Sequence, residues 1–454
     1  MSAPQRPKRI GGRPGVALLA LAGALVAAST AAACSSGAYM AGQSTTTGHT
    51  TSQSPTTGAV SSTTGVSASD GSWSLIPAGK VSITTPMGWT GKELLVADAG
   101  CCASVGSVNM SSFNPQTNSW GTLPPAPLTA RSFAVGAWTG SQMIVAGGWA
   151  SPDGTMVHAT QSTDGAAWDA SSDTWYPIAA MPNPLPYPSY DPRSFWTSTE
   201  VLVWDSNPAT GTEVVMAYNP ATNTWRYLPT STLAPRVGAV AVWTGRELIV
   251  WGGASEARDS HGQIVGITPL DDGAALNPAT NTWRRLPTAP VPGRAYAAAA
   301  WSGHEVLLWG GQNGLTSQIG KGAGYNPTTN TWRPLPLSPL RAKQGSTGVW
   351  TGRFFIVMGG SAGPRANFPV PGLGSAAYDP ASNTWTAMPA APDFGPLAPT
   401  PNIPADQRVG ALGIWTGKSV LMLGGATSCC YQGPRPDGVA WNSASQVPAT
   451  RSTS

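Results

Sequence analysis

The 454-residue chain lacks the short motifs that mark many enzyme and cofactor sites. It has no nucleophile elbow, no glycine-rich phosphate-binding loop and no cysteine and histidine spacing typical of zinc. It has only four histidines and five cysteines. From the sequence we therefore assign no catalytic residue, no metal site and no cofactor.

An excess of positive charge is also absent once the N-terminus is set aside. The chain has 25 basic and 21 acidic residues, but Arg6, Lys8, Arg9 and Arg13 lie in the first 13 residues. Subtracting these four leaves 21 of each sign. Because nucleic-acid-binding proteins carry an extended basic surface, this balance argues against a nucleic-acid partner.

Residues 1–33 are predicted to be a signal peptide, with a basic start, an apolar stretch and a small-residue end. Cys34 follows three alanines, which resembles the lipidation signal of bacterial lipoproteins. We therefore expect an exported protein whose lipidated Cys34 holds it at the outer face of the cell membrane. Ala31 stands where that signal usually has leucine, so a secreted protein and an uncleaved membrane anchor stay open as alternatives.

The rest of the chain divides by composition. Residues 34–70 are rich in Ser, Thr and Gly with few apolar side chains, which predicts a flexible tether. Residues 71–442 contain internal repeats, and residues 443–454 are predicted to be a disordered tail.

Two kinds of tryptophan turn recur through residues 71–442. The first is Trp-Thr-Gly or a variant, at Trp89, Trp138, Trp196, Trp243, Trp301, Trp350 and Trp415. The second is Asn/Asp-x-Trp, at Trp120, Trp175, Trp225, Trp283, Trp332 and Trp385. Glycine doublets such as Gly252-Gly253 follow the second strand of most repeats. A period of about 50 residues with four short strands per repeat predicts an all-β propeller.

The two counts differ by one, because seven turns of the first kind are followed by only six of the second. A strand at Gly71–Pro77 precedes the first repeat, and the last repeat ends near Asn442 without a fourth strand. We therefore predict a seven-bladed β-propeller of four-stranded blades, in which the N-terminal strand completes the last blade and closes the ring.

The best-matching segments share the pattern Tyr-Asn/Asp-Pro-x-Thr/Ser-Asn-Thr-Trp, at Tyr218–Pro229, Tyr325–Pro336 and Tyr378–Pro389. This pattern resembles the kelch repeat, including the propeller of the galactose oxidase superfamily, over about Gly71–Asn442. The resemblance implies a propeller fold but fixes no function. The copper ligands of galactose oxidase cannot be matched, because the cysteines of the repeat region stand in adjacent pairs.

The connections predict two unlike faces. Turns between strands one and two, and between strands three and four, are short in every repeat; we call their side the tight-turn face. Connections between strands two and three, and from blade to blade, are long, and we call their side the loop face. Since binding sites concentrate in variable loops on rigid scaffolds, we place the ligand site on the loop face.

An arginine stands seven residues before the first tryptophan in four repeats: Arg131, Arg236, Arg294 and Arg408. Lys80, Arg193 and Arg341 occupy nearby positions in the other three repeats. Such a ring could bind carboxylates, phosphates or sugar acids through bidentate hydrogen bonds. The alternative is that each arginine pairs with neighbouring carbonyls or carboxylates and only holds the ring together. Trp149 is predicted to offer a flat surface to a sugar or peptide.

Four cysteines remain after Cys34: Cys101, Cys102, Cys429 and Cys430. In an exported protein we expect them to form two disulfides, either across the first and last blades or within each adjacent pair. Free thiols or a metal site are further alternatives.

The leading function is a surface-tethered module that binds a protein or carbohydrate ligand through the loop face. The alternative is an enzyme acting on sugar acids, since kelch propellers include sialic-acid mutarotases. Asp98, Asp153 and Asp205 lie near the ends of second strands and could supply its carboxylate. Only His158 and His261 among the four histidines lie in connections of the loop face. Asp271-Asp272 and His261 could bind a cation, although a solvated loop is the simpler interpretation.

Overall fold

The structure is a computed structural model that describes residues 70–79, 81, 86–98, 106–150, 159–186, 191–259, 264–314, 317–362, 374–392, 408–425 and 437–443. Every regular element in these ranges is a β-strand, so the all-β class is confirmed. Within the same ranges, no helix long and apolar enough to cross a membrane is found.

Most of the described strands form four-stranded antiparallel sheets, which we number in chain order. Sheet 1 consists of β2 (Met87–Trp89), β3 (Leu94–Asp98), β4 (Asn109–Asn114) and β5 (Ser119–Leu123). Sheet 2 consists of β7 (Val135–Trp138), β8 (Gln142–Ala146), β11 (Gly165–Asp169) and β12 (Thr174–Ile178). Sheet 3 consists of β13 (Arg193–Trp196), β14 (Val201–Asn207), β15 (Thr212–Asn219) and β16 (Thr224–Tyr227). Sheet 4 consists of β17 (Val240–Trp243), β18 (Leu248–Trp251), β21 (Gly273–Asn277) and β22 (Thr282–Arg285). Sheet 5 consists of β23 (Ala298–Trp301), β24 (Val306–Trp309), β25 (Gly322–Asn326) and β26 (Thr331–Pro334). Sheet 6 consists of β27 (Gln344–Trp350), β28 (Phe355–Ser361), β29 (Ala376–Asp379) and β30 (Thr384–Ala387).

Sheet 7 joins the two ends of the described chain. Its order is β1 (Gly71–Ile76), β33 (Gly438–Ser443), β32 (Ser419–Leu423) and β31 (Leu412–Trp415). β1 runs antiparallel to β33 with Gly71 opposite Ser443 and Ile76 opposite Gly438. The N-terminal strand therefore stands as the fourth strand of the sheet whose other three strands come last, which is the arrangement that the tryptophan count predicts.

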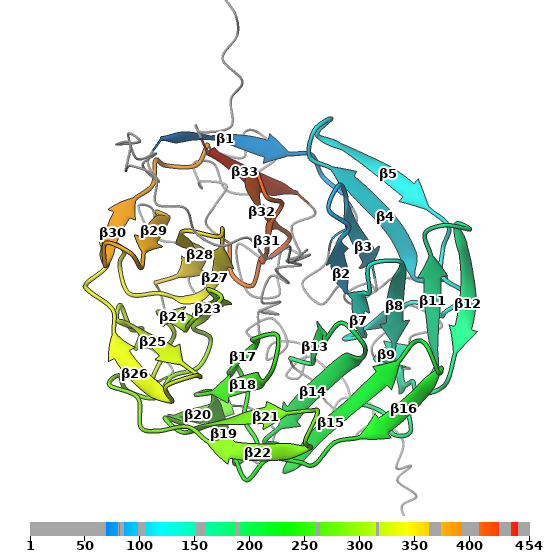
Figure 1. Ribbon diagram of the computed structural model, residues 1–454, viewed down its shortest axis with the longest axis horizontal. Helices are drawn as coiled ribbons and strands as arrows, with labels where there is room; N and C mark the ends of the chain where they lie inside the picture. Colours follow the sequence, from blue (N-terminus) through cyan, green and yellow to red (C-terminus); the bar gives the residue numbers. More distant parts are fainter. Residues whose placement is uncertain are drawn as a thin grey trace, which may run out of the picture.

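The sheets are arranged around a common centre, with the first strand of each innermost (Figure 1). Their apolar side chains form clusters between neighbouring sheets. One cluster combines Trp251 of sheet 4 with Leu308 of sheet 5, both nearly inaccessible to solvent. Another combines Leu421 of sheet 7 with Val96 of sheet 1. Because each sheet is apolar on both faces, each needs a neighbour on either side.

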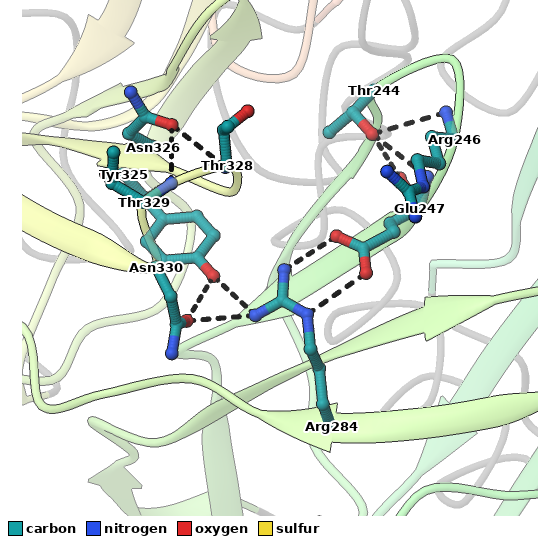
Figure 2. A network of polar contacts seen from close by, with 9 residues as sticks. All are labelled: Thr244, Arg246, Glu247, Arg284, Tyr325, Asn326, Thr328, Thr329 and Asn330. Carbon is teal, nitrogen blue, oxygen red and sulfur yellow. Dashed lines mark hydrogen bonds and ion pairs between the residues drawn. The ribbon is translucent and has the colours of Figure 1, made fainter.

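Turns on the tight-turn face are built by local hydrogen bonds. Oγ1 of Thr244 accepts from the backbone nitrogens of Arg246 and Glu247, and Oδ1 of Asn326 accepts from those of Thr328 and Thr329 (Figure 2). Short polar side chains that bond the backbone two or three residues on are what such turns require.

The loop face is more regular than the sequence predicts. β9 (Trp149–Ala150) pairs with β10 (Thr160–Gln161) and with β6 (Arg131–Ser132), while β19 (Ala254–Arg258) pairs with β20 (Ile264–Pro269). These two long connections therefore contain short paired strands, which the sequence does not predict. In sheet 3 the connection between the second and third strands is short, because β14 and β15 are long and meet at a turn of residues 208–211.

The six tryptophans of the second kind, together with Trp73 of β1, link one sheet to the next. In all seven sheets, the indole Nε1 of the fourth strand donates to a carbonyl just after the fourth strand of the neighbouring sheet, at 2.7–3.1 Å. The pairs are Trp120 with Pro77, Trp175 with Pro124, Trp225 with Ala179, Trp283 with Pro229, Trp332 with Pro287, Trp385 with Pro336 and Trp73 with Pro389. Each ring is thus packed while its N–H keeps a partner.

A second link occurs where an arginine follows that tryptophan. Arg284 forms a two-pronged ion pair with Glu247 of its own sheet and donates to the Tyr325 hydroxyl and Asn330 Oδ1 of sheet 5 (Figure 2). Arg333 repeats this with Glu305, Tyr378 and Asn383, and Arg226 bonds Glu200 and Asn281. Sheets 3 to 6 are therefore joined by the same polar link.

We expect this link to contribute measurably to stability. In a double-mutant cycle of Arg284→Gln with Tyr325→Phe, the coupling should be roughly 0.5–1 kcal/mol, because the pair is only partly shielded from water. Thr386→Ala, at the equivalent position of sheet 6, serves as the control and should change the free energy of unfolding by less than the Arg284 variant. Additive effects of Arg284→Gln and Tyr325→Phe in urea unfolding would show that the two sheets are not coupled here.

Candidate functional site

The predicted arginines lie at the loop-face ends of the first strands and are buried. Arg131, Arg236, Arg294 and Arg408 are each at most 2% exposed. In Arg236, Nη1 donates to the Gly252 carbonyl at 2.9 Å and to the Asp272 carbonyl at 3.4 Å, and Nε donates to the Ala234 carbonyl. The guanidinium therefore ties together the start of the first strand, the end of the second and the start of the third.

The other three arginines repeat this contact with the glycine doublet. Nη1 of each donates to the first glycine of its doublet and to the residue before the third strand: Arg131 to Gly147 and Asp164, Arg294 to Gly310 and Lys321, and Arg408 to Gly424 and Asp437. Glycine is required in the doublet because both residues have positive φ, 72° at Gly252 and 90° at Gly253. A Cβ on Gly252 would lie 2.7 Å from the Arg294 carbonyl oxygen.

Three of the four guanidiniums also have a carboxylate partner. Arg131 pairs with Asp164 at 2.7 Å, and Arg236 and Arg408 pair with Asp272 and Asp437. The hydrogen bond from Arg131 is the main cause that lowers the pKa of Asp164.

Sheet 5 departs from this pattern, because Lys321 occupies the position of the aspartate. Burial lowers the pKa of Arg294 to about 10, whereas its Nη2 lacks a hydrogen-bond partner among the described residues just as Nη2 of Arg236 does. The side chain of Lys321 is exposed, so a second positive charge stands at the rim of the same position.

Residues two positions after Arg236, Arg294, Lys343 and Arg408 link the sheets at the inner end of the loop face. Gly238, Tyr296, Gly345 and Gly410 have φ between 58° and 66°. The Tyr296 nitrogen donates to the Gly238 carbonyl, the Gly345 nitrogen to the Tyr296 carbonyl and the Gly410 nitrogen to the Gly345 carbonyl, at 2.7–3.1 Å. This backbone chain runs through sheets 4 to 7 and holds the inner loop face in a fixed geometry.

Comparison with protein families identifies the repeat. The family model of the KLHDC2/KLHL20/DRC7 Kelch-repeats domain matches residues 196–425, which is half of the chain. The chain belongs to this kelch-repeat family. A kelch-repeat domain suggests a protein-binding or scaffold module, which agrees with the leading function class expected from the sequence.

Solved structures agree on the fold. A fungal alcohol oxidase of the AA5 family, in complex with copper, matches with a TM-score of 0.58 and 14% identity, over 84% of this chain and 78% of that chain. At this identity the likeness shows the fold alone. No curated protein matches the chain.

The contacts of these four buried arginines match the alternative stated from the sequence, in which each arginine pairs with neighbouring carbonyls or carboxylates. Ligand binding by Arg131, Arg236, Arg294 and Arg408 stays a prediction, although their burial leaves little surface for a ligand. Trp149 is 8% exposed and lies in β9. This exposure leaves little of the ring for a ligand, and binding at Trp149 stays a prediction.

The ring of basic residues needs one correction. In sheet 6, Lys343 rather than Arg341 occupies the arginine position; it is fully buried and its Nζ donates to the Gly374 carbonyl at 2.8 Å. Counting seven residues back from Trp350 would have found it. Arg341 is exposed, and Lys80 lies outside the described residues.

In sheet 3, the predicted Arg193 stands three residues before Trp196 and binds Asp191 at 2.6 Å. Both side chains are buried, and desolvation raises the pKa of Asp191 to about 6 despite the opposing effect of Arg193. This ion pair takes the place of the contact that the arginines of other sheets make with the glycine doublet, since sheet 3 has Asp205-Ser206 there.

The described residues do not provide a metal site. No group of three or more His, Cys, Asp or Glu side chains among them could hold a metal ion, and the described histidine, His304, lies on an exposed turn. Asp205 is fully buried and accepts from the Ser206 nitrogen. Asp98 ends β3, whereas Asp153, His158 and His261 lie outside the described residues.

The predicted lipid and disulfide cysteines, Cys34, Cys101, Cys102, Cys429 and Cys430, also lie outside the described residues. The strands that precede the two pairs are β3 and β32, whose side chains Val96 and Leu423 belong to one hydrophobic cluster. The disulfides stay a prediction.

The exception in sheet 5 gives a stability test. Lys321→Asp should supply the missing partner of Arg294 and raise the free energy of unfolding by roughly 1 kcal/mol, a modest gain because aspartates at this position are partly exposed. Asp272→Lys, the reverse change in sheet 4, should lower it by at least as much. Chemical denaturation of both variants decides: if Lys321→Asp is neutral while Asp272→Lys destabilises, the two positions are not equivalent.

Proposed function

We propose that this protein is an exported, membrane-tethered kelch propeller that binds a protein or carbohydrate ligand through its loop face. Its seven sheets are the seven blades of one ring, and β1 closes that ring by completing the last blade. The pairing of β1 with β33, the seven tryptophan bonds and the cluster between sheets 7 and 1 support this architecture.

The observation that carries the binding proposal is the difference between the two faces. On the tight-turn face, the turns between first and second strands repeat one hydrogen-bonded geometry, as at Thr90, Thr139, Thr197 and Thr244. On the loop face, the connections differ from blade to blade in length and structure, from a hairpin in sheet 4 to a short turn in sheet 3. Variation on one face of a rigid ring is typical of a surface that recognises a particular ligand.

The buried arginines have a supporting task in this proposal. They hold the ends of three strands together in a blade, so the connections that leave those ends start from fixed positions. A binding surface supported in this way loses little conformational entropy when a ligand docks.

The hairpin of β19 and β20 is the part of the loop face best suited to a direct contact. Ile264 and Ile267 pack on a small cluster that includes Tyr296, while Val265 is 57% exposed. An exposed β-branched residue beside a packed pair offers an apolar contact on a defined support.

The ligand test compares two exposed apolar residues. The purified protein is titrated against a panel of cell-envelope fragments, sialic and uronic acids, and candidate envelope proteins. For a ligand so identified, Val265→Lys should weaken binding about tenfold or more. Tyr227→Lys, at a residue 56% exposed on the outer strand β16, should leave binding unchanged.

Equal effects of the two variants would contradict binding at the hairpin of β19 and β20. The same panel, followed by NMR for sugar anomerisation, separates binding from catalysis: acceleration by the protein would replace the binding proposal with the sugar-acid enzyme.

The membrane tether is tested at Cys34. The Cys34→Ser variant should leave the membrane fraction and appear in the soluble exported fraction, since a serine cannot carry the thioether-linked lipid of a lipoprotein. Cell fractionation with detection of the protein measures this. A variant that partitions as the parent does would rule out lipid anchoring.

A further inference from the structure

The tight-turn face carries a ring of exposed residues around its centre. Each stands immediately before the second strand or one residue earlier, at the tip of the turn from the innermost strand (Figure 1). We call this set the inner-turn ring: Lys92, Ser141, Thr199, Arg246, His304, Arg353 and Lys418. All seven are exposed, four are lysine or arginine and none is acidic.

Most acidic groups close to the ring are already paired. Glu200, Glu247 and Glu305 follow ring positions, but each forms an ion pair with an arginine of its own fourth strand at 2.6–2.7 Å. Asp379 pairs with Arg353 of the ring. Glu93 follows Lys92 and offsets its charge. Arg246 and Lys418 are thus the members whose charge no neighbouring carboxylate of the turn offsets.

The remaining carboxylates of this face are Asp70, which precedes β1, and those of sheet 2. Asp169 caps its own turn by accepting from Ser171 and Ser172, and Asp173 accepts from the Trp168 indole. The ring positions nearest to them along the chain are the uncharged Ser141 and Thr199. Positive charge therefore concentrates over the turns of sheets 4 to 7.

The described chain begins on this same face. In sheet 7, Ser72 lies opposite Asn442, and Asn442 lies opposite Ser419, which closes the turn that contains Lys418. Gly71 and Ser443 are therefore at the tight-turn end of the sheet. The described chain therefore enters the fold beside the inner-turn ring, at the face opposite the long connections.

We propose that the tight-turn face docks on an anionic phospholipid surface through the inner-turn ring, so that the loop face points away from the membrane. The proposal rests on the proposed lipid anchor, which would bring this face to the membrane, and adds the surface and its partner. One acyl chain with a basic patch binds membranes more firmly than either alone. Each Lys or Arg at an anionic surface strengthens binding about fivefold.

Charge, rather than insertion of aromatic rings, is the attraction. The tryptophans beneath the turns, such as Trp243, Trp301 and Trp415, are half-buried and pack against the clusters between sheets. Binding should therefore fall as salt concentration rises, because surface charges are screened.

The test uses the exported Cys34→Ser protein, which lacks the lipid, and vesicles of phosphatidylcholine with or without phosphatidylglycerol. Co-sedimentation should show binding only to vesicles with phosphatidylglycerol, and added salt should abolish it. Arg246→Glu with Lys418→Glu should reduce this binding at least tenfold. The matched control, Lys321→Glu with Arg341→Glu, reverses two exposed charges on the loop face and should leave binding close to that of the parent.

The outcomes are distinct. Binding lost only in the Arg246 and Lys418 variant supports the proposal. Absence of binding to phosphatidylglycerol, or equal loss in both variants, overturns it, because net charge rather than this face would then decide. A cooperative thermal unfolding transition in each variant confirms that both remain folded. Because the Cys34→Ser protein has no covalent lipid, a negative vesicle result would not contradict the proposed Cys34 anchor. Likewise, a fractionation result against the Cys34 anchor would not change the outcome of the vesicle experiment.

Discussion

The structure depends on the fact that each four-stranded sheet is apolar on both of its faces. In sheet 4, for example, Leu248 and Val250 belong to the cluster with sheet 3, whereas Ile249 and Trp251 belong to the cluster with sheet 5. A sheet of this kind cannot be stable at the end of a row, since one face would meet water. Both faces of every sheet are covered only when the last sheet packs against the first. Sheet 7 has four strands only because β1 pairs with β33.

Specific polar contacts then convert repeated burial into defined geometry. The tryptophan bonds set the outer edge of each sheet against its neighbour, and the buried arginines hold three strand ends together within a sheet. Both use backbone carbonyls as acceptors, so they tolerate changes of side chain between repeats. This tolerance explains how Ala179 replaces proline as an acceptor, and how Lys343 replaces arginine in sheet 6.

Much of the fold could be predicted from the sequence, because the signals are local and repeated. Tryptophan spacing gives the strands, and the unequal numbers of the two turns indicate that Gly71–Ile76 belongs with the last repeat. The burial of Trp149 could not be predicted, since it depends on the pairing of β9 with strands on either side. The aspartate partners of the arginines were missed although a signal exists: Asp164, Asp272 and Asp437 each precede the glycine that opens a third strand.

In the proposed function the molecule has two faces with different tasks, a uniform face near the chain entry and a variable face for recognition. Both tasks require that the ring stays closed while it works. Native-state hydrogen exchange measures this directly, because local opening exposes amides without global unfolding. The account predicts that amides paired between β1 and β33 exchange as slowly as those between β17 and β18. Exchange at β1 that is orders of magnitude faster, with β17 and β18 still protected, would show that the N-terminal strand detaches and would contradict the closed ring.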